Sequence, residues 1–350
     1  MSSRPTPSQW NPALLQGISA ALFSAFASGL VPIFGKQAFE AGVAPFSVVM
    51  LRTVGAAGVL WLVYLFWRRK YIYIYPFGLA ACLTAGVING LGSLLYYTSL
   101  QNINASIGQL LFTLYLMFLT LFSWLDGYRI SRLTLLRLIL ALIAVILLKW
   151  TRDGQADWVA GLMMIAAGAL YALHVSVNQH TLYDIPSPTV TLYTLTGMAG
   201  TVFIAYLLGG LPALPMTFNA WSPVLLLTAV TIISRLTLFI GVKHLGGMQT
   251  VLINLSEALF TIVAARLVLG ESLSPIQWLG VAVLVFSILL VTREASLGAI
   301  PRPKPWLQIF TAWFAVLSQL FEPAPEWPAR ASRPGAKIKI MPPHPPERGE

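Results

Sequence analysis

The chain has 350 residues, of which 57% are hydrophobic and only 10% are charged, and its formal net charge is +10. Soluble domains carry about a quarter charged residues, so this chain lacks the side chains to cover a water-facing surface. Nucleic-acid binding is disfavoured because it needs clustered basic residues on a folded polar surface. A basic excess in an apolar chain instead fits membrane topology and attraction to anionic lipid headgroups.

Apolar runs that are long enough to cross a bilayer, which takes roughly 20 helical residues, recur along the chain. Ten transmembrane helices are expected, at about 12–34, 45–67, 74–100, 104–125, 133–150, 158–180, 188–208, 222–242, 248–268 and 275–292. Short polar, proline-rich or glycine-rich loops separate these runs. The sequence therefore predicts an all-α, polytopic membrane protein of about ten helices.

The distribution of basic residues predicts which side of the membrane each loop faces. With the amino-terminal segment 1–11 in the cytoplasm, the cluster Arg68, Arg69 and Lys70 and most other basic residues fall on the inner side. We therefore expect a multi-pass protein of the cell membrane with both termini in the cytoplasm.

The chain beyond the last apolar run divides into two parts. Residues 294–322 are predicted to form a linker and an amphipathic interfacial helix, because the apolar run from Trp306 to Phe321 is only 16 residues long. Residues 323–350 are rich in proline and basic residues, which predicts a disordered cytoplasmic tail.

The two halves of the chain, 12–150 and 151–293, contain similar stretches. Residues 125–131 end in Ser131 and residues 267–274 end in Ser274, and each stretch is followed by an apolar run that ends its half. With five crossings in each half, the second copy must be inserted upside down relative to the first. Inverted repeats of this kind are typical of transporters, with the solute site near the membrane midplane between the copies. Chance similarity among apolar helices is the alternative.

The chain resembles the EamA-type branch of the drug/metabolite transporter superfamily over about residues 14–292. The resemblance rests on Arg52, on the stretch 255–260, and on the stretch 269–274 followed by 277–280. The first repeat departs from the family pattern in having Tyr128 after Gly127, where the family usually has glutamate, and Ala258 stands where the family usually has proline. The resemblance implies two inverted five-helix repeats, a central cavity, and solute export or exchange. We assign structural roles to four of the family residues, namely Arg52, Gly127, Gly270 and Glu271.

Charged residues within the predicted spans are candidates for function, because each costs roughly 2.5–3.5 kcal/mol to insert. Arg52, Arg235, Glu257 and, near a span end, Arg266 are of this kind. Arg235 and Glu257 fall at similar depths on consecutive helices, so we expect them to form an ion pair. A solute or a proton would compete for this pair during transport; a static bridge that fixes helix packing is the alternative.

Polar side chains also recur at helical spacing, as expected for helices that surround a wet cavity. The predicted substrate-binding residues are Asn89, Ser93, Tyr96, Gln109, Thr113, Tyr115, Tyr171, His174, Asn178, Arg235, Asn254 and Glu257. Helix packing through polar contacts is the alternative role for any one of them. His174 could shuttle protons, although a neutral, hydrogen-bonded histidine is the favoured interpretation. Gly86 and Gly90 form a GxxxG motif that close helix packing explains.

Enzyme signatures are missing from the sequence. There is no HExxH, GxSxG or P-loop motif and no metal-spaced Cys/His cluster, so no catalytic residue, metal or cofactor is predicted. The expected partners are a small solute and the lipid bilayer, with a homodimer as a possible assembly and no nucleic acid.

The predicted function is a secondary transporter that exports or exchanges a small metabolite, such as an amino acid or a similar polar or amphipathic solute, by alternating access. Coupling would run through protons at Glu257 or be absent. The alternatives are a flippase for a lipid-linked carrier, and a membrane-embedded scaffold or enzyme without transport.

Overall fold

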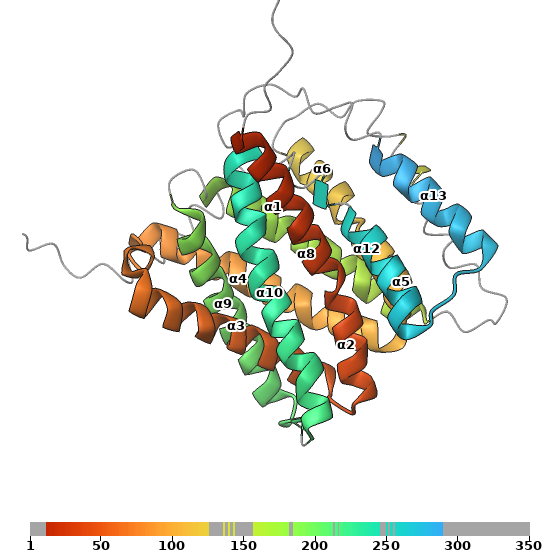
Figure 1. The fold of residues 1–350 in the computed structure, drawn as a ribbon, viewed down its shortest axis with the longest axis horizontal. Coiled ribbons are helices and arrows are strands. Elements are labelled where there is room, and N and C mark those ends of the chain that lie inside the picture. The colour runs from red at the N-terminus through yellow and green to blue at the C-terminus, as the bar shows by residue number, and fades with distance from the viewer. Residues whose placement is uncertain are drawn as a thin grey trace, which may run out of the picture.

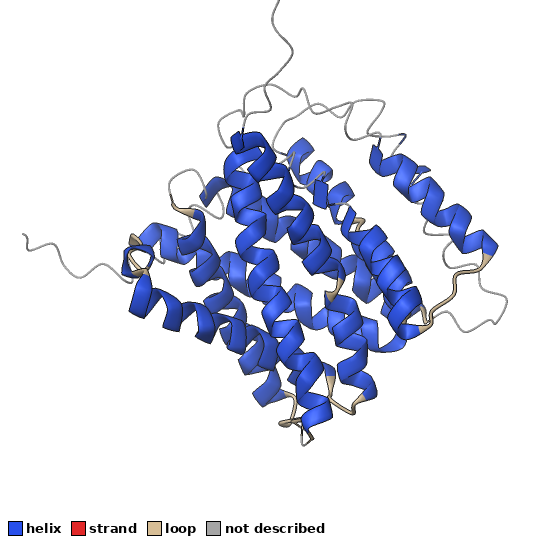
Figure 2. Cartoon of the chain, in the orientation of Figure 1, coloured by secondary structure: helices blue, strands red, loops and turns tan. Residues whose placement is uncertain are grey.

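Every regular element that the computed structural model describes is a helix (Figure 2). The structure describes residues 12–125, 157–181, 185–245 except 213 and 216, and 250–289 except 251, 252 and 255, together with residues 136, 139, 140 and 143. The elements are α1 (Pro12–Gly29), α2 (Val31–Glu40), α3 (Pro45–Trp67), the 3-10 turn η1 (Arg69–Tyr71), α4 (Pro76–Asn102), α5 (Ala105–Phe112), α6 (Tyr115–Leu125), α8 (Trp158–Thr181), α9 (Ser187–Leu208), α10 (Phe218–Leu245), α12 (Ser256–Ala264), the π-helical turn η2 (Ala265–Leu269) and α13 (Pro275–Leu289). The helices form one bundle with α13 at its edge (Figure 1).

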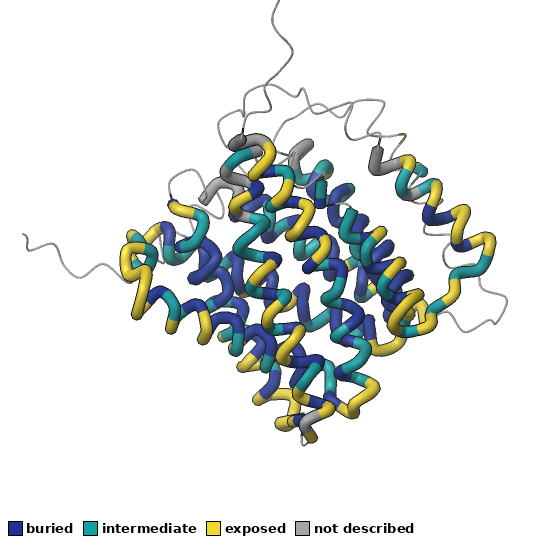
Figure 3. The backbone as a smooth tube through the Cα atoms, in the orientation of Figure 1, coloured by how far each residue is buried: buried dark blue, intermediate teal, exposed yellow. Residues whose placement is uncertain are grey.

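The surface of the bundle carries large apolar side chains, as expected for a protein whose solvent is lipid. Exposed (yellow) residues recur along the outer faces of the helices (Figure 3), and they include Leu62, Phe203 and Leu225, which expose 56%, 45% and 57% of their surface. Seven helical segments of the described chain are long and apolar enough to cross a membrane. The chain is therefore an integral, multi-pass membrane protein.

These seven segments confirm seven of the predicted spans. They cover the runs expected at 12–34, 45–67, 74–100, 104–125, 158–180, 188–208 and 222–242. The run at 133–150 lies almost wholly outside the described residues, and the last two runs are described only in part, as α12 with η2 and as α13. Segments 1–11 and 294–350, with the predicted interfacial helix and tail, also lie outside the described residues.

The first span extends six residues past its predicted end, to Glu40, and it is broken into α1 and α2 at Leu30. Pro32 explains the break, because proline lacks an N–H and its ring clashes with the carbonyl four residues earlier, here that of Ser28. Within the extension, the long side chain of Lys36 donates to the carbonyl of Gln101 at 3.5 Å.

The fourth span is also broken, into α5 and α6, and the break lies near the middle of the bundle. The hydroxyl of Thr113 donates to the carbonyl of Gln109 at 2.8 Å, a contact that bends helices. The N–H of Leu114 then bonds Leu111 three residues earlier, so the turn is locally of the tighter 3-10 kind. Interrupted helices near the midplane are a common feature of transporter binding sites.

Glycines allow α4 and α9 to approach very closely. A Cβ on Gly197 would lie 2.6 Å from the carbonyl oxygen of Leu83, and one on Gly90 would lie 2.8 Å from the Cβ of Thr201. A Cβ on Gly86 would overlap the backbone of Thr194. The GxxxG motif is therefore explained by backbone-to-backbone packing, as expected.

Glu271 ties the second repeat to the first. Gly270 has a φ of +68°, which is favourable for glycine, and it ends η2 so that the chain turns toward α5. The carboxylate of Glu271 accepts hydrogen bonds from the N–H groups of Ala105 and Ser106 at 2.7 and 3.0 Å and from the Ser106 hydroxyl at 2.7 Å. It thereby caps the amino terminus of α5, where a negative charge is favoured. Gly127, the corresponding glycine of the first repeat, lies outside the described residues.

The largest buried apolar cluster lies at the end of the bundle where α2 joins α3, referred to below as the α2–α3 end. Its members come from α2 and α5, from the ends of α4 and α9, from the starts of α3, α8 and α10, and from Val43 and Ala265. Ile33, Val48, Leu100, Val202 and Val224 are each almost completely buried within it. This end of the bundle is therefore packed as a solid apolar core.

Candidate functional site

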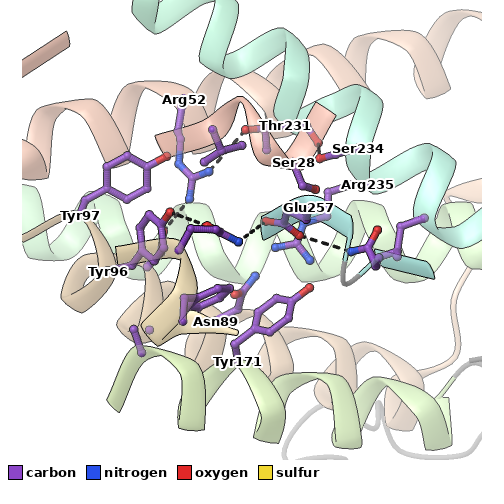
Figure 4. Close-up of a pocket in the computed structure, with 18 residues that line it drawn as sticks. Ser28, Arg52, Asn89, Tyr96, Tyr97, Tyr171, Thr231, Ser234, Arg235 and Glu257 are labelled. Atoms are coloured by element: carbon purple, nitrogen blue, oxygen red, sulfur yellow. Dashed lines mark hydrogen bonds between the residues drawn. The ribbon is translucent and has the colours of Figure 1, made fainter. Parts of the chain in front are cut away.

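A polar cavity of about 100 Å³ lies in the middle of the bundle and is not fully enclosed. Eight predicted site residues line it: Asn89, Ser93, Tyr96, Gln109, Tyr171, Arg235, Asn254 and Glu257. Arg52 and Glu257, from different halves of the chain, both point into this space (Figure 4). One water takes up about 10–15 Å³ of such a cavity, so there is room for several waters or the polar part of a small metabolite.

The cavity is bounded on one side by the apolar cluster of the α2–α3 end. On α10, Leu227 belongs to the cluster and Thr231, one turn further from that end, lines the cavity. On α3, Val49 belongs to the cluster and Arg52 follows in the cavity. On α2 and α4 the cluster residues Ala38 and Leu100 likewise lie further toward the α2–α3 end than the cavity residues Val31 and Asn89.

Arg52 is held in the cavity by three neutral side chains. Its Nη2 donates to the Ser93 hydroxyl at 2.6 Å and its Nη1 to the Thr231 hydroxyl at 3.4 Å. The guanidinium carbon lies 4.7 Å from the centre of the Tyr97 ring, a favourable cation–π contact. Arg52 is only 8% exposed, and its Nε has no hydrogen-bond partner. Arg52, which the sequence singled out as a charged residue within a span and to which we assigned a structural role, thus lies in the cavity wall.

Glu257 lies across the cavity from Arg52 and is held by amides (Figure 4). Gln109 donates its Nε2 to one carboxylate oxygen at 2.9 Å, and Asn254 donates its Nδ2 to the other at 3.5 Å. The hydroxyl of Tyr96 donates to the Gln109 carbonyl at 3.2 Å, which fixes the orientation of that amide. Side chains from α4, α5 and the segment leading into α12 therefore position one carboxylate.

The predicted ion pair between Arg235 and Glu257 is not formed. Both residues line the cavity, as their similar depth predicted, but no nitrogen–oxygen contact of 4.0 Å or less joins them within the described residues. The guanidinium of Arg235 instead lies over the Tyr171 ring, 5.8 Å from its centre. The prediction was wrong because amides already bond both oxygens of Glu257, while the ring face of Tyr171 draws the cation.

Aromatic rings form one wall of the cavity. Tyr96 and Phe112 pack edge to face at 5.1 Å, and Phe112 and Tyr171 are tilted at 5.3 Å. Tyr115 was predicted to line the cavity, but it packs behind this wall, 5.0 Å from Tyr171 and buried against α6 and α8. Such ring pairs are stabilising, and Tyr96, Phe112 and Tyr171 all line the cavity.

Three more predicted site residues make internal contacts and do not line the cavity. Thr113 bonds the backbone at the α5–α6 break, as described above. His174 Nδ1 lies 2.9 Å from the Ala85 carbonyl, and the Asn178 amide lies 3.2 Å from His174 Nε2. This is the pattern of a neutral imidazole that donates from Nδ1 and accepts at Nε2, and it makes a packing contact between α8 and α4.

Sequence reasoning missed the remaining lining residues. They are Ser28, Val31, Gly92, Tyr97, Phe112, Ala167, Thr231, Ser234 and Leu238. Several are small or apolar and carry no polar signal. On α10, however, Thr231, Arg235 and Leu238 share one helix face, and this spacing would have identified Thr231. Metal binding finds no support in the described residues, which contain no group of three or more His, Cys, Asp or Glu side chains that could hold an ion.

Comparison with known proteins identifies the family. The EamA-like transporter family matches the chain twice, over residues 15–150 and 158–293. The chain belongs to the EamA-like transporter family.

Its relatives agree with this membership. Over 274 residues the chain is 24% identical to an uncharacterized transporter of Bacillus subtilis (strain 168), YcbK, covering 73% of this chain and 86% of that protein. A known crystal structure superposes with a TM-score of 0.57 at 18% identity, over 79% of this chain and 98% of the other, and supports the fold alone. The two family matches correspond to the two predicted repeats, so the cavity is lined by residues of both.

Proposed function

We propose that this EamA-family protein is a secondary transporter that exports or exchanges a small polar metabolite by alternating access between its two repeats. The observation that carries the proposal is the central cavity. It holds two arginines and a glutamate in the middle of a membrane bundle, where charged residues are costly and usually serve function. A site between two repeats is where rocking of one repeat against the other would expose a solute to each side in turn.

The apolar cluster supports this mechanism, because along α2, α3, α4 and α10 it lies between the cavity and the α2–α3 end of the bundle. The basic residues Arg68, Arg69 and Lys70 lie at the opposite end, between α3 and α4. Basic loops favour the cytoplasmic side, so the α2–α3 end would face outward and both termini would lie inside the cell. In this orientation the apolar cluster would lie between the cavity and the outside of the cell.

Transport can be tested with the full-length protein in proteoliposomes. The vesicles are loaded with amino acids, organic acids, sugars or nucleotide precursors, and efflux is measured with and without a pH gradient. We expect one solute class to leave faster than from protein-free vesicles. Arg235→Ala should slow this efflux at least about tenfold, since a buried charged contact is typically worth 2–5 kcal/mol.

The matched control is Arg266→Ala, because Arg266 is an exposed arginine on η2 that does not line the cavity. It should transport at the normal rate. Efflux of every solute at the protein-free rate, with the protein folded in the vesicles, would contradict the proposal.

A further inference from the structure

The charges that line the cavity do not balance. Among the described lining residues, Arg52 and Arg235 are cations and Glu257 is the one acidic residue. Glu257 is hydrogen-bonded to two neutral amides, and neither arginine lies within 4.0 Å of an acidic oxygen in the described chain. The described lining therefore carries a formal charge of +1.

An excess positive charge in this position is costly. Removing a charge from water without a partner costs several kcal/mol, and the cost is offset only by an opposite charge at close range. The hydroxyl groups and the Tyr97 ring that hold Arg52 orient the guanidinium but bring no full negative charge. Of the five guanidinium N–H donors, only two are engaged by these hydroxyls, and Nε has no partner although Arg52 is 92% buried.

The hydrogen bonds of Arg52 would also be explained if this residue served only to hold α3, α4 and α10 together. Such a role would not explain Arg235, which has no carboxylate partner among the described residues and lies over the Tyr171 ring at the cavity wall. Two arginines that face one cavity repel each other, so packing alone gives no reason to place both there. A bound anion relieves the repulsion and supplies the missing charge.

We infer that the transported solute is a small organic monoanion whose carboxylate binds between Arg52 and Arg235 and whose apolar part lies on the aromatic wall of Phe112 and Tyr171. This inference rests on the proposed transport function. A single negative charge matches the +1 lining, whereas a phosphate group carries about −1.5 to −2 at neutral pH. Arginine suits a carboxylate because its planar donors pair with both oxygens.

A zwitterionic amino acid is the closest competitor. Its carboxylate would meet the arginines and its ammonium group would meet Glu257, but its net charge of zero leaves the lining at +1. The decisive comparison is therefore among probes with one carbon skeleton and different charge: 3-phenylpropionate (anion), phenylalanine (zwitterion) and 3-phenylpropionamide (neutral).

Binding of each probe to the full-length protein in lipid nanodiscs is measured by titration calorimetry. We expect 3-phenylpropionate to bind at least about tenfold more tightly than the other two. Equal or tighter binding of phenylalanine or of the amide would overturn the anion assignment. It would leave transport itself standing, because transport is judged by the vesicle assay.

Two cavity variants make the inference falsifiable in both directions. Arg235→Gln should abolish the preference for the anion over the amide, and Arg235→Lys should retain it. Glu257→Gln makes the lining +2 and should tighten binding of the anion several-fold, an effect that a purely structural role would not produce. Arg266→Gln is the matched control and should bind like the native protein. Weaker anion binding in a folded Glu257→Gln variant, or an unchanged preference in Arg235→Gln, would contradict the inference.

Discussion

At the scale of single residues, the cavity charges are positioned by neutral groups. Hydroxyls and a tyrosine ring hold Arg52, and two amides hold Glu257, so neither charge is cancelled by its nearest neighbours. His174, in contrast, does not line the cavity, and its ring nitrogens form hydrogen bonds with the Ala85 carbonyl and the Asn178 amide. The carboxylate and the histidine are therefore expected to differ in function although both lie inside the membrane bundle.

A matched pair of substitutions tests this difference. Protonation of Glu257 at low pH would raise the positive charge of the cavity, so transport that depends on this charge should vary with pH. Glu257→Gln is expected to flatten the pH dependence of efflux because it removes the titrating group.

His174→Gln should leave the pH dependence of efflux unchanged and lower the free energy of unfolding by about 1–3 kcal/mol, the cost of disturbing a buried hydrogen bond. Efflux from proteoliposomes at several pH values and thermal unfolding in detergent check the two outcomes. A flattened profile in the histidine variant alone would assign the proton role to His174.

At the scale of elements, two contacts hold helices of the first repeat against helices of the second. Glu271 joins the end of η2 to the start of α5, and glycines bring α4 against α9. The first contact links the two repeats at the α2–α3 end, and the second lets backbone atoms of the two repeats approach without intervening side chains. Both contacts come from residues whose local sequence motifs, Gly-Glu and GxxxG, were recognisable before the structure.

Loss of the α5 cap should destabilise the protein. Glu271→Ala removes an acceptor of three hydrogen bonds at a helix amino terminus, and the free energy of unfolding should fall by about 1–2 kcal/mol. The control is Glu40→Ala, because Glu40 is an exposed glutamate at the end of α2. Thermal unfolding in one detergent compares the two variants with the native protein. Equal stability of both variants would show that the cap contributes nothing.

The α4–α9 contact offers a second matched pair. Gly197→Ala would place a Cβ 2.6 Å from the Leu83 carbonyl oxygen and should cost about 1–3 kcal/mol, since helices must separate to admit it. Gly200→Ala, one turn further on the same helix, meets no atom within 4 Å and should be neutral or slightly stabilising. The change in stability relative to the native protein, measured by thermal unfolding, should therefore differ in sign or size between the two variants. Equal losses of stability would indicate that α9 does not tolerate alanine at either glycine.

At the scale of the whole molecule, the two repeats have diverged around a shared cavity. In the register that sets Gly127 opposite Gly270, Gly92 of the first repeat stands opposite Arg235 of the second, and both line the cavity. A related backbone thus carries a cation in one copy and no side chain in the other. The two copies therefore contribute different groups to the cavity, and Gly92 permits close packing against α8, because a Cβ there would lie 3.2 Å from the Cβ of Leu170.

We expect the apolar cluster at the α2–α3 end to block access to the cavity from that side in the absence of solute. Cys82 is the one cysteine of the chain, so Cys82→Ala provides a background for single-cysteine variants. Ser234→Cys in the cavity should react with a membrane-impermeant thiol reagent from the side of the α3–α4 turn. Val224→Cys in the apolar cluster should be protected from both sides. Rapid reaction of Val224→Cys from the α2–α3 end would show that this end is open at rest. Mass spectrometry of the labelled protein measures the extent of reaction.

Composition and pattern alone showed that lipid surrounds most of the protein and that the fold is helical. They also identified most of the spans, the twofold repeat and eight of the residues that line the cavity. This was achievable because a polar or charged side chain inside an apolar span must find a polar neighbourhood, and a cavity is the natural one. Only the tertiary structure decided which side chains contact one another in the cavity. Arg52 bonds Thr231, which is 179 positions away, and Arg235 rests on Tyr171 instead of pairing with Glu257. Such contacts depend on how helices distant in sequence pack side by side, and local sequence carries no record of that packing.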